Sequence, residues 1–75
     1  MRQLESVVHS DPDILGGVPV FVGTRVPVRI LFEYLSGGDS LDKFLDQYPS
    51  VGRDQAVSAL ELSEDFLESG ARSTG

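Results

Sequence analysis

Residues 41–60 read LDKFLDQYPSVGRDQAVSAL, which is two helical patterns separated by a short turn. The first pattern repeats apolar side chains at the spacing of one helix face, at Leu41, Phe44, Leu45 and Tyr48. Pro49 ends this pattern because proline cannot continue a helix, and a second pattern begins near Gly52. The stretch therefore predicts two amphipathic helices joined through residues 48–52, the outline of a helix-turn-helix.

Another helix is expected before this pair. Pro27 suits the first position of a helix. The apolar face of that helix is formed by Val28, Leu31, Phe32 and Leu35. Gly37 and Gly38 end it, and Ser40 or Asp39 is expected to cap the helix that follows.

The last helix is predicted to be the longest. It begins near Arg53 and reaches a natural stop at Gly70. We therefore expect three helices within residues 27–69 and a frayed tail at residues 70–75, which have nothing to bury.

A small β-ribbon is predicted over residues 1–26. Two β-rich runs, 6–9 and 18–22, flank a segment dense in turn formers. Pro19 confines its strand to a sheet edge. Three glycines are expected at positions of positive φ or tight reversal: Gly16, Gly17 and Gly23. Because an isolated hairpin is marginal, the ribbon must pack on helices or pair with a partner's strand.

Composition limits the chain to one small domain of residues 1–75. It is 40% apolar and 24% charged, which is typical of globular rather than disordered chains. A domain of this size buries only about 60% of its exposable surface, so its stability is marginal. With no cysteine and one histidine, neither a disulfide nor a zinc site is expected. A homodimer is therefore expected, with no metal or cofactor.

Charge and hydropathy restrict the partners. Twelve acids against six bases give a net charge of −6, which argues against indiscriminate binding to nucleic acid or to anionic membranes. No apolar run approaches the roughly 18 residues of a membrane span, and the first residues lack the apolar core of a signal peptide. We expect a cytoplasmic protein without a membrane partner.

The helix-turn-helix outline suggests DNA reading by the start of the last helix. Arginine can grip guanine, and glutamine can pair with adenine. The candidate base-reading residues are Arg53, Gln55 and Ser58. Any three-helix bundle needs similar apolar spacing, so the pattern alone leaves a bundle without DNA binding equally open.

Two further arginines lie where the ribbon meets the first helix. Arg25 and Arg29 could clamp a phosphate together with Thr24. The simpler interpretation is that both are solvated or paired with acids such as Asp11.

The residue pattern contains no catalytic set. His9 has no second histidine or acid cluster near it in sequence, and Asp42 with Asp46 is typical of a solvated helix face. The glycine spacing matches no phosphate-binding fingerprint. We therefore expect a protein that is not an enzyme.

The order and spacing of these motifs resemble the domain of unknown function 433 family. The resemblance covers SDPDI (10–14), GGVPV (16–20), GTRVPV (23–28), LSGG (35–38), FLDQYP (44–49) and QAVSAL (55–60). It implies a homeodomain-like or winged helix-turn-helix, and thus a mainly α fold with a short N-terminal β-hairpin. It also implies a bacterial type II antitoxin similar to VapB-type proteins, with operator DNA and a PIN-like ribonuclease toxin as partners. Where the family usually has leucine followed by a Ser or Thr cap, this chain has Val51 and Gly52.

The acidic C-terminal segment is the candidate toxin-binding element. Its acids could mimic RNA phosphates in a basic groove, and its apolar residues could anchor the contact. The candidate residues are Glu61, Leu62, Glu64, Asp65, Phe66, Leu67 and Glu68. Two alternatives stay open: these acids are a solvated face, or the chain is an interaction module whose helix-turn-helix does not bind DNA.

Overall fold

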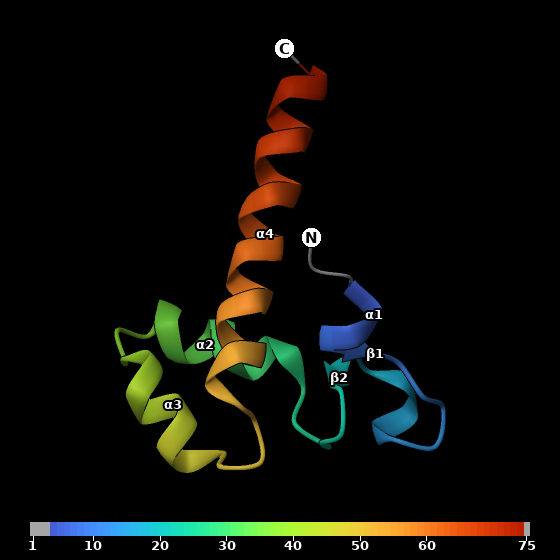
Figure 1. The fold of residues 1–75 in the computed structure, drawn as a ribbon, viewed down its shortest axis with the longest axis vertical. Helices are drawn as coiled ribbons and strands as arrows, with labels where there is room; N and C mark the ends of the chain where they lie inside the picture. The colour runs from blue at the N-terminus through green and yellow to red at the C-terminus, as the bar shows by residue number, and fades with distance from the viewer. Residues whose placement is uncertain (1–3, 75) are drawn as a thin grey trace.

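A computed structural model of the chain describes residues 4–74 (Figure 1). The elements are α1 (Leu4–Val7), β1 (Val8–His9), a 3₁₀ turn (Leu15–Gly17), β2 (Val20–Phe21), α2 (Val28–Ser36), α3 (Leu41–Gln47) and α4 (Arg53–Thr74). The hairpin, α2 and α3 gather around one end of α4, whose other end rises clear of them. The predicted fold class is confirmed: the chain is mainly helical, with a short N-terminal hairpin and a helix-turn-helix-like arrangement.

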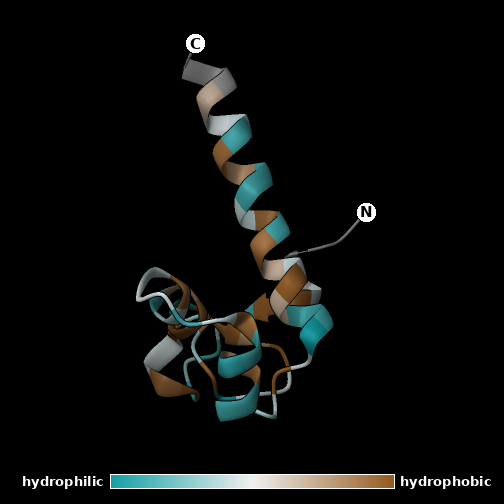
Figure 2. Ribbon diagram, turned by 90° about the vertical axis from the view of Figure 1, so that its left-hand side faces the viewer, coloured by the Kyte–Doolittle hydropathy of each residue, from teal (hydrophilic) through white to brown (hydrophobic). Residues whose placement is uncertain are grey.

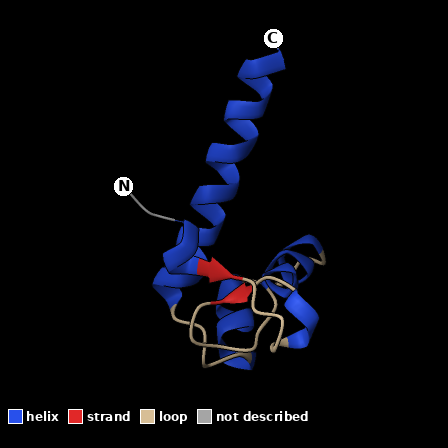
Figure 3. Cartoon of the chain, turned by 90° about the vertical axis from the view of Figure 1, so that its right-hand side faces the viewer, coloured by secondary structure: helices blue, strands red, loops and turns tan. Residues whose placement is uncertain are grey.

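The hairpin is shorter than predicted. Its two strands are drawn in red in Figure 3. Their antiparallel register pairs Val8 with Phe21 and His9 with Val20. The start of the run expected as strand 6–9 belongs instead to α1. Between the strands the chain makes a 3₁₀ turn with positive φ at Gly16 and Gly17. One further main-chain hydrogen bond, from the Val22 N–H to the Val7 carbonyl at 3.0 Å, joins the two runs beyond the paired strands.

Both ends of the helical region differ from the prediction. Pro27 has extended backbone and forms a bridge with Val20, so α2 begins one residue later, at Val28. At the other end, α4 passes Gly70 and continues to Thr74, so the expected tail is largely helical. Glycine inside a helix costs only about 1 kcal/mol, which need not end it.

The core is centred on Phe44 of α3. Its ring centroid lies 6.2 Å from that of Phe21 and 5.3 Å from that of Tyr48. From α2, Tyr34 meets Phe44 edge to face at 5.7 Å. Desolvation, followed by the neighbouring Tyr48, raises the pKa of the Tyr34 phenol above its ordinary value. The core therefore joins the hairpin to α2 and α3.

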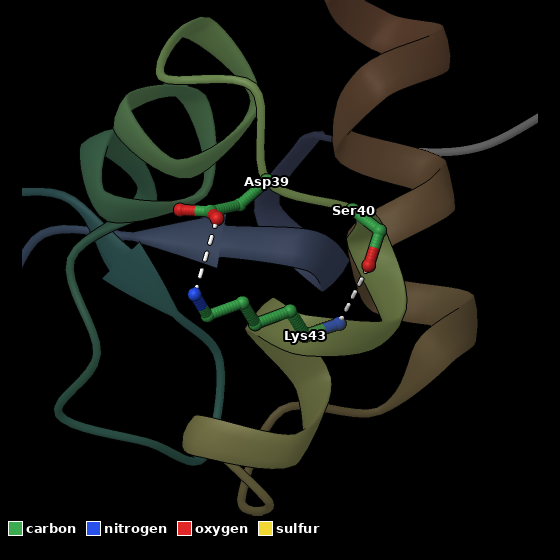
Figure 4. Close-up of polar contacts among 3 residues, drawn as sticks. All are labelled: Asp39, Ser40 and Lys43. Carbon is green, nitrogen blue, oxygen red and sulfur yellow. Dashed lines mark hydrogen bonds and ion pairs between the residues drawn. The ribbon is translucent and has the colours of Figure 1, made fainter.

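Ser40 caps α3 as predicted (Figure 4). Its Oγ accepts a hydrogen bond of 3.1 Å from the main-chain N–H of Lys43. The Lys43 ammonium reaches back to the Asp39 carboxylate at 3.2 Å. These local contacts fix where α3 begins, and thereby how Phe44 enters the core.

Leu15 has a φ of +50°, which is costly for a residue with a side chain, and that side chain is about half exposed. We predict that Leu15→Gly raises the free energy of unfolding by about 0.5–1 kcal/mol, measured by urea denaturation. The matched control is Val18→Gly, because Val18 is exposed in the same loop with an ordinary φ of −63° and should lose stability. Equal losses in both variants would contradict the assignment of strain to Leu15.

Candidate functional site

We call residues 22–29 and 48–58 the turn face. It contains the five candidate DNA-binding residues, which are Arg25, Arg29, Arg53, Gln55 and Ser58. Gln55 occupies its centre. Its Nε2 donates to the Val22 carbonyl at 2.9 Å, and its Oε1 accepts from the Gly52 N–H at 3.2 Å. Both ends of the amide are used inside the molecule, so Gln55 is not free to pair with adenine in this arrangement.

The other two candidate base readers are also engaged. Ser58 is only 8% exposed, so its hydroxyl is not available to reach a base in the major groove of DNA. Arg53 forms an ion pair with Asp42 of α3. Both partners of that pair are well exposed, so the pair contributes little to stability and can be exchanged for another anion. Of the three candidates, Arg53 alone has an exposed side chain.

The two arginines of the predicted phosphate clamp have different surroundings. Arg29 pairs with Glu33 one turn along α2, at 3.0 Å. Arg25 is exposed and has no acidic partner in the part of the chain that the structure describes. The Thr24 hydroxyl donates to the Phe21 carbonyl at 2.8 Å and accepts from the Val26 N–H at 3.0 Å. Thr24 therefore shapes the loop rather than completing the clamp.

The second candidate surface is the arm, defined as residues 61–71 of α4. At its base Leu62 still packs against the core. Beyond that point the helix stands clear of the other elements (Figure 2), with Phe66 77% and Leu67 68% exposed. A groove of about 750 Å³ runs along its base. The groove is lined by Val8, Val28, Ala59, Leu62, Ser63, Asp65, Phe66, Leu67 and Ser69.

The candidate toxin-binding residues are spread around the arm. Residues three and four apart share one face of a helix, so Leu62 and Phe66 lie together in the groove, and Glu61, Glu64 and Glu68 lie together on another face. Asp65 lines the groove and also borders Glu61 and Glu68, and Leu67 lies on the far side of Glu64. A flat partner therefore cannot contact all seven residues, whereas a partner that wraps the helix can.

Sequence reasoning missed two residues beside Arg25. His9 and Ser50 line a pocket together with Ile14, Gly23, Thr24, Arg25 and Val26. Four separate segments meet there: β1, the residue that precedes the 3₁₀ turn, the loop before α2, and the turn between α3 and α4. No local motif signals this proximity, because it arises only when the hairpin folds against the turn.

Residues 4–74 were compared with the requirements of a metal site and of a membrane span. No group of three or more potential ligands from His, Asp and Glu lies close enough to hold a metal ion in this described part. None of the described helices is long and apolar enough to cross a bilayer.

The fold and the turn face define a small helix-turn-helix-like domain with an N-terminal hairpin. The chain belongs to the family described as "Protein of unknown function (DUF433)", whose model matches residues 8–62. A crystal structure of a DUF433 member from Anabaena variabilis ATCC 29413 superposes with a TM-score of 0.69 at 26% identity, covering 93% of this chain and 69% of that one.

A curated relative is the uncharacterized protein y4eO of Sinorhizobium fredii NGR234. It is 47% identical over 45 residues, which are 60% of this chain. The match spans only 20% of the relative's length.

Because Gln55 joins the two halves of the turn face, we predict that Gln55→Ala lowers the free energy of unfolding by about 1–3 kcal/mol in urea denaturation. The Val22 carbonyl and the Gly52 N–H would each lose a partner. The control is Gln47→Ala, on an exposed side chain at the end of α3, which should change stability by less than about 0.5 kcal/mol. Equal stability of the two variants would show that Gln55 has no structural role.

Proposed function

We propose that this protein is the antitoxin of a bacterial type II toxin–antitoxin pair, a VapB-type protein that acts in the cytoplasm without catalytic activity. In this proposal the arm neutralises a PIN-like ribonuclease and the turn face binds operator DNA. The observation that carries the proposal is the exposure of Phe66 and Leu67 on a helix that extends beyond its own core.

The arm has the properties of a surface completed by a partner. An isolated helical segment of this length is marginal in water, and tertiary packing supplies most helical stability in proteins. Large exposed apolar side chains beside a groove favour a protein contact. The acids of the second face complement a basic groove of the kind that a ribonuclease needs for RNA. These features together support a basic protein partner.

Operator binding is supported by the helix-turn-helix-like fold and by Arg25, which has no acidic partner among the side chains that the structure describes. A homodimer would double the phosphate contacts, and the net charge of −6 confines those contacts to a local basic surface.

The second candidate function is an interaction module that does not bind DNA. The internal hydrogen bonds of Gln55 and the burial of Ser58 favour it. Salt dependence separates the two functions, because a DNA reader loses affinity steeply as salt rises. Absence of specific operator binding, by the protein alone and with its toxin, would leave the interaction module.

The experiment is affinity purification of the full chain at native expression, with co-purifying proteins identified by mass spectrometry. We predict stoichiometric recovery of a PIN-like nuclease. The double variant Phe66→Ser and Leu67→Ser should reduce that recovery at least tenfold without changing stability, because both side chains are largely exposed.

Two further variants locate the contact. Glu61, Glu64 and Glu68 changed together to Gln should weaken inhibition of the nuclease if the acidic face is used. Leu15→Ser is the control, because Leu15 is an exposed apolar residue outside the arm. Recovery of the protein alone, or full inhibition by both arm variants, would overturn the proposal.

A further inference from the structure

We propose that Arg25 and Ser50 bind a phosphate group in the pocket between β1, the loop before α2 and the turn between α3 and α4. The source of the phosphate is the backbone of duplex DNA, so the inference rests on the operator-binding part of the proposed function. The inference adds to the proposed function a defined phosphate site and one residue, Ser50, which is not among the candidate DNA-binding residues.

The pocket has a volume of about 600 Å³ and is open to solvent. Arg25 is the one arginine or lysine that lines the pocket, and no aspartate or glutamate lines it. This is notable in a chain with a net charge of −6. An anion entering the pocket therefore meets a cation without a competing carboxylate among the lining residues.

Arg25 differs from the other cations whose side chains are described. Arg29 is paired with Glu33, Lys43 with Asp39 and Arg53 with Asp42. Within the same part of the chain, Arg25 has no such partner. Its planar guanidinium keeps its donors available, and their fork matches two oxygens of a phosphate.

The walls of the pocket are held in place by internal hydrogen bonds. The Gln55 amide joins the Val22 carbonyl, just before the Arg25 loop, to the Gly52 N–H, just after Ser50. The buried Thr24 hydroxyl fixes the loop itself through Phe21 and Val26. Arg25 and Ser50 therefore sit on two segments whose separation is set before any ligand arrives, which lowers the cost of binding.

His9 supplies an independent observation at the same place. It lines the pocket, and its Nε2 is buried without a hydrogen-bond partner among the described residues. A buried ring nitrogen without a partner is rare in folded proteins. Because that nitrogen is covered, an anion reaches it only if the imidazole turns toward the pocket. Arg25 and Ser50 therefore carry the site, and His9 adjoins it.

The position of the pocket favours a phosphate that is part of a larger molecule. Ser50 belongs to the turn that precedes α4, so one lining residue of the pocket lies three positions before that helix begins. In helix-turn-helix proteins the second helix of the motif enters the major groove, and contacts to flanking phosphates fix its register. A backbone phosphate held by Arg25 would orient α4 without reading sequence.

The test compares Arg25→Gln with Lys43→Gln in the full chain. Both variants remove one positive charge, but Lys43 does not line the pocket and is paired with Asp39. Fluorescence anisotropy with a labelled duplex from the promoter of the protein's own gene should show about tenfold weaker binding for Arg25→Gln. The slope of log affinity against log salt should fall by about one. Ser50→Ala should weaken binding less, and Lys43→Gln should stay within about twofold of wild type.

Equal behaviour of Arg25→Gln and Lys43→Gln on a duplex that the wild type binds would overturn this inference and leave operator binding intact. If the wild type binds no duplex, operator binding fails, and amide NMR with inorganic phosphate decides the site. Shifts at residues 23–26 and 50 that disappear in Arg25→Gln would support a site for free phosphate. Absence of those shifts would overturn the site itself.

Discussion

The small core around Phe44 holds the hairpin, α2 and α3 against the first half of α4 and leaves the arm uncovered. Val51, Ala56 and Ala59 bring the start of α4 against Phe21 and Leu31, and beyond Leu62 the large apolar side chains Phe66 and Leu67 stay mostly exposed. A helix of 22 residues is about 33 Å long, well beyond the reach of such a core. The arm is therefore exposed as a consequence of the fold.

The exposed half of α4 is two-sided, and this restricts the shape of any partner. Leu62 and Phe66 continue the line of the core, with the groove and Asp65 at their edge. The remaining acids lie on another face and stay compatible with solvent or with a basic surface. A partner that wraps the arm could bury the apolar face and pair with the acids at the same time. A flat partner would use one face and leave the other in water.

The turn face follows a different constraint, which is the need to satisfy buried polar groups. The Gln55 amide bonds at both ends to main-chain groups of two distant segments, and the Thr24 hydroxyl both donates and accepts within its own loop. These bonds remove two polar side chains from recognition and make the loop and turn rigid. Among the described side chains of the turn face, Arg25 is the one cation without an acidic partner. It lines a pocket whose walls are held by these same hydrogen bonds.

The sequence by itself determined the elements whose cause is local. The apolar spacing predicted α2, α3 and the start of α4, Ser40 was correctly expected as a cap, and Gly16, Gly17 and Gly23 have positive φ as expected. Helix spacing, capping and glycine conformation depend on residues a few positions apart.

Only the tertiary structure decided which polar residues are available. Gln55 bonds to Val22, 33 positions away, and Ser58 is buried by packing, so neither behaves as its residue type suggested. The meeting of His9, Arg25 and Ser50 likewise requires the hairpin to fold against the turn. Satisfaction of a donor or acceptor depends on atoms brought together from distant parts of the chain, which residue spacing cannot report.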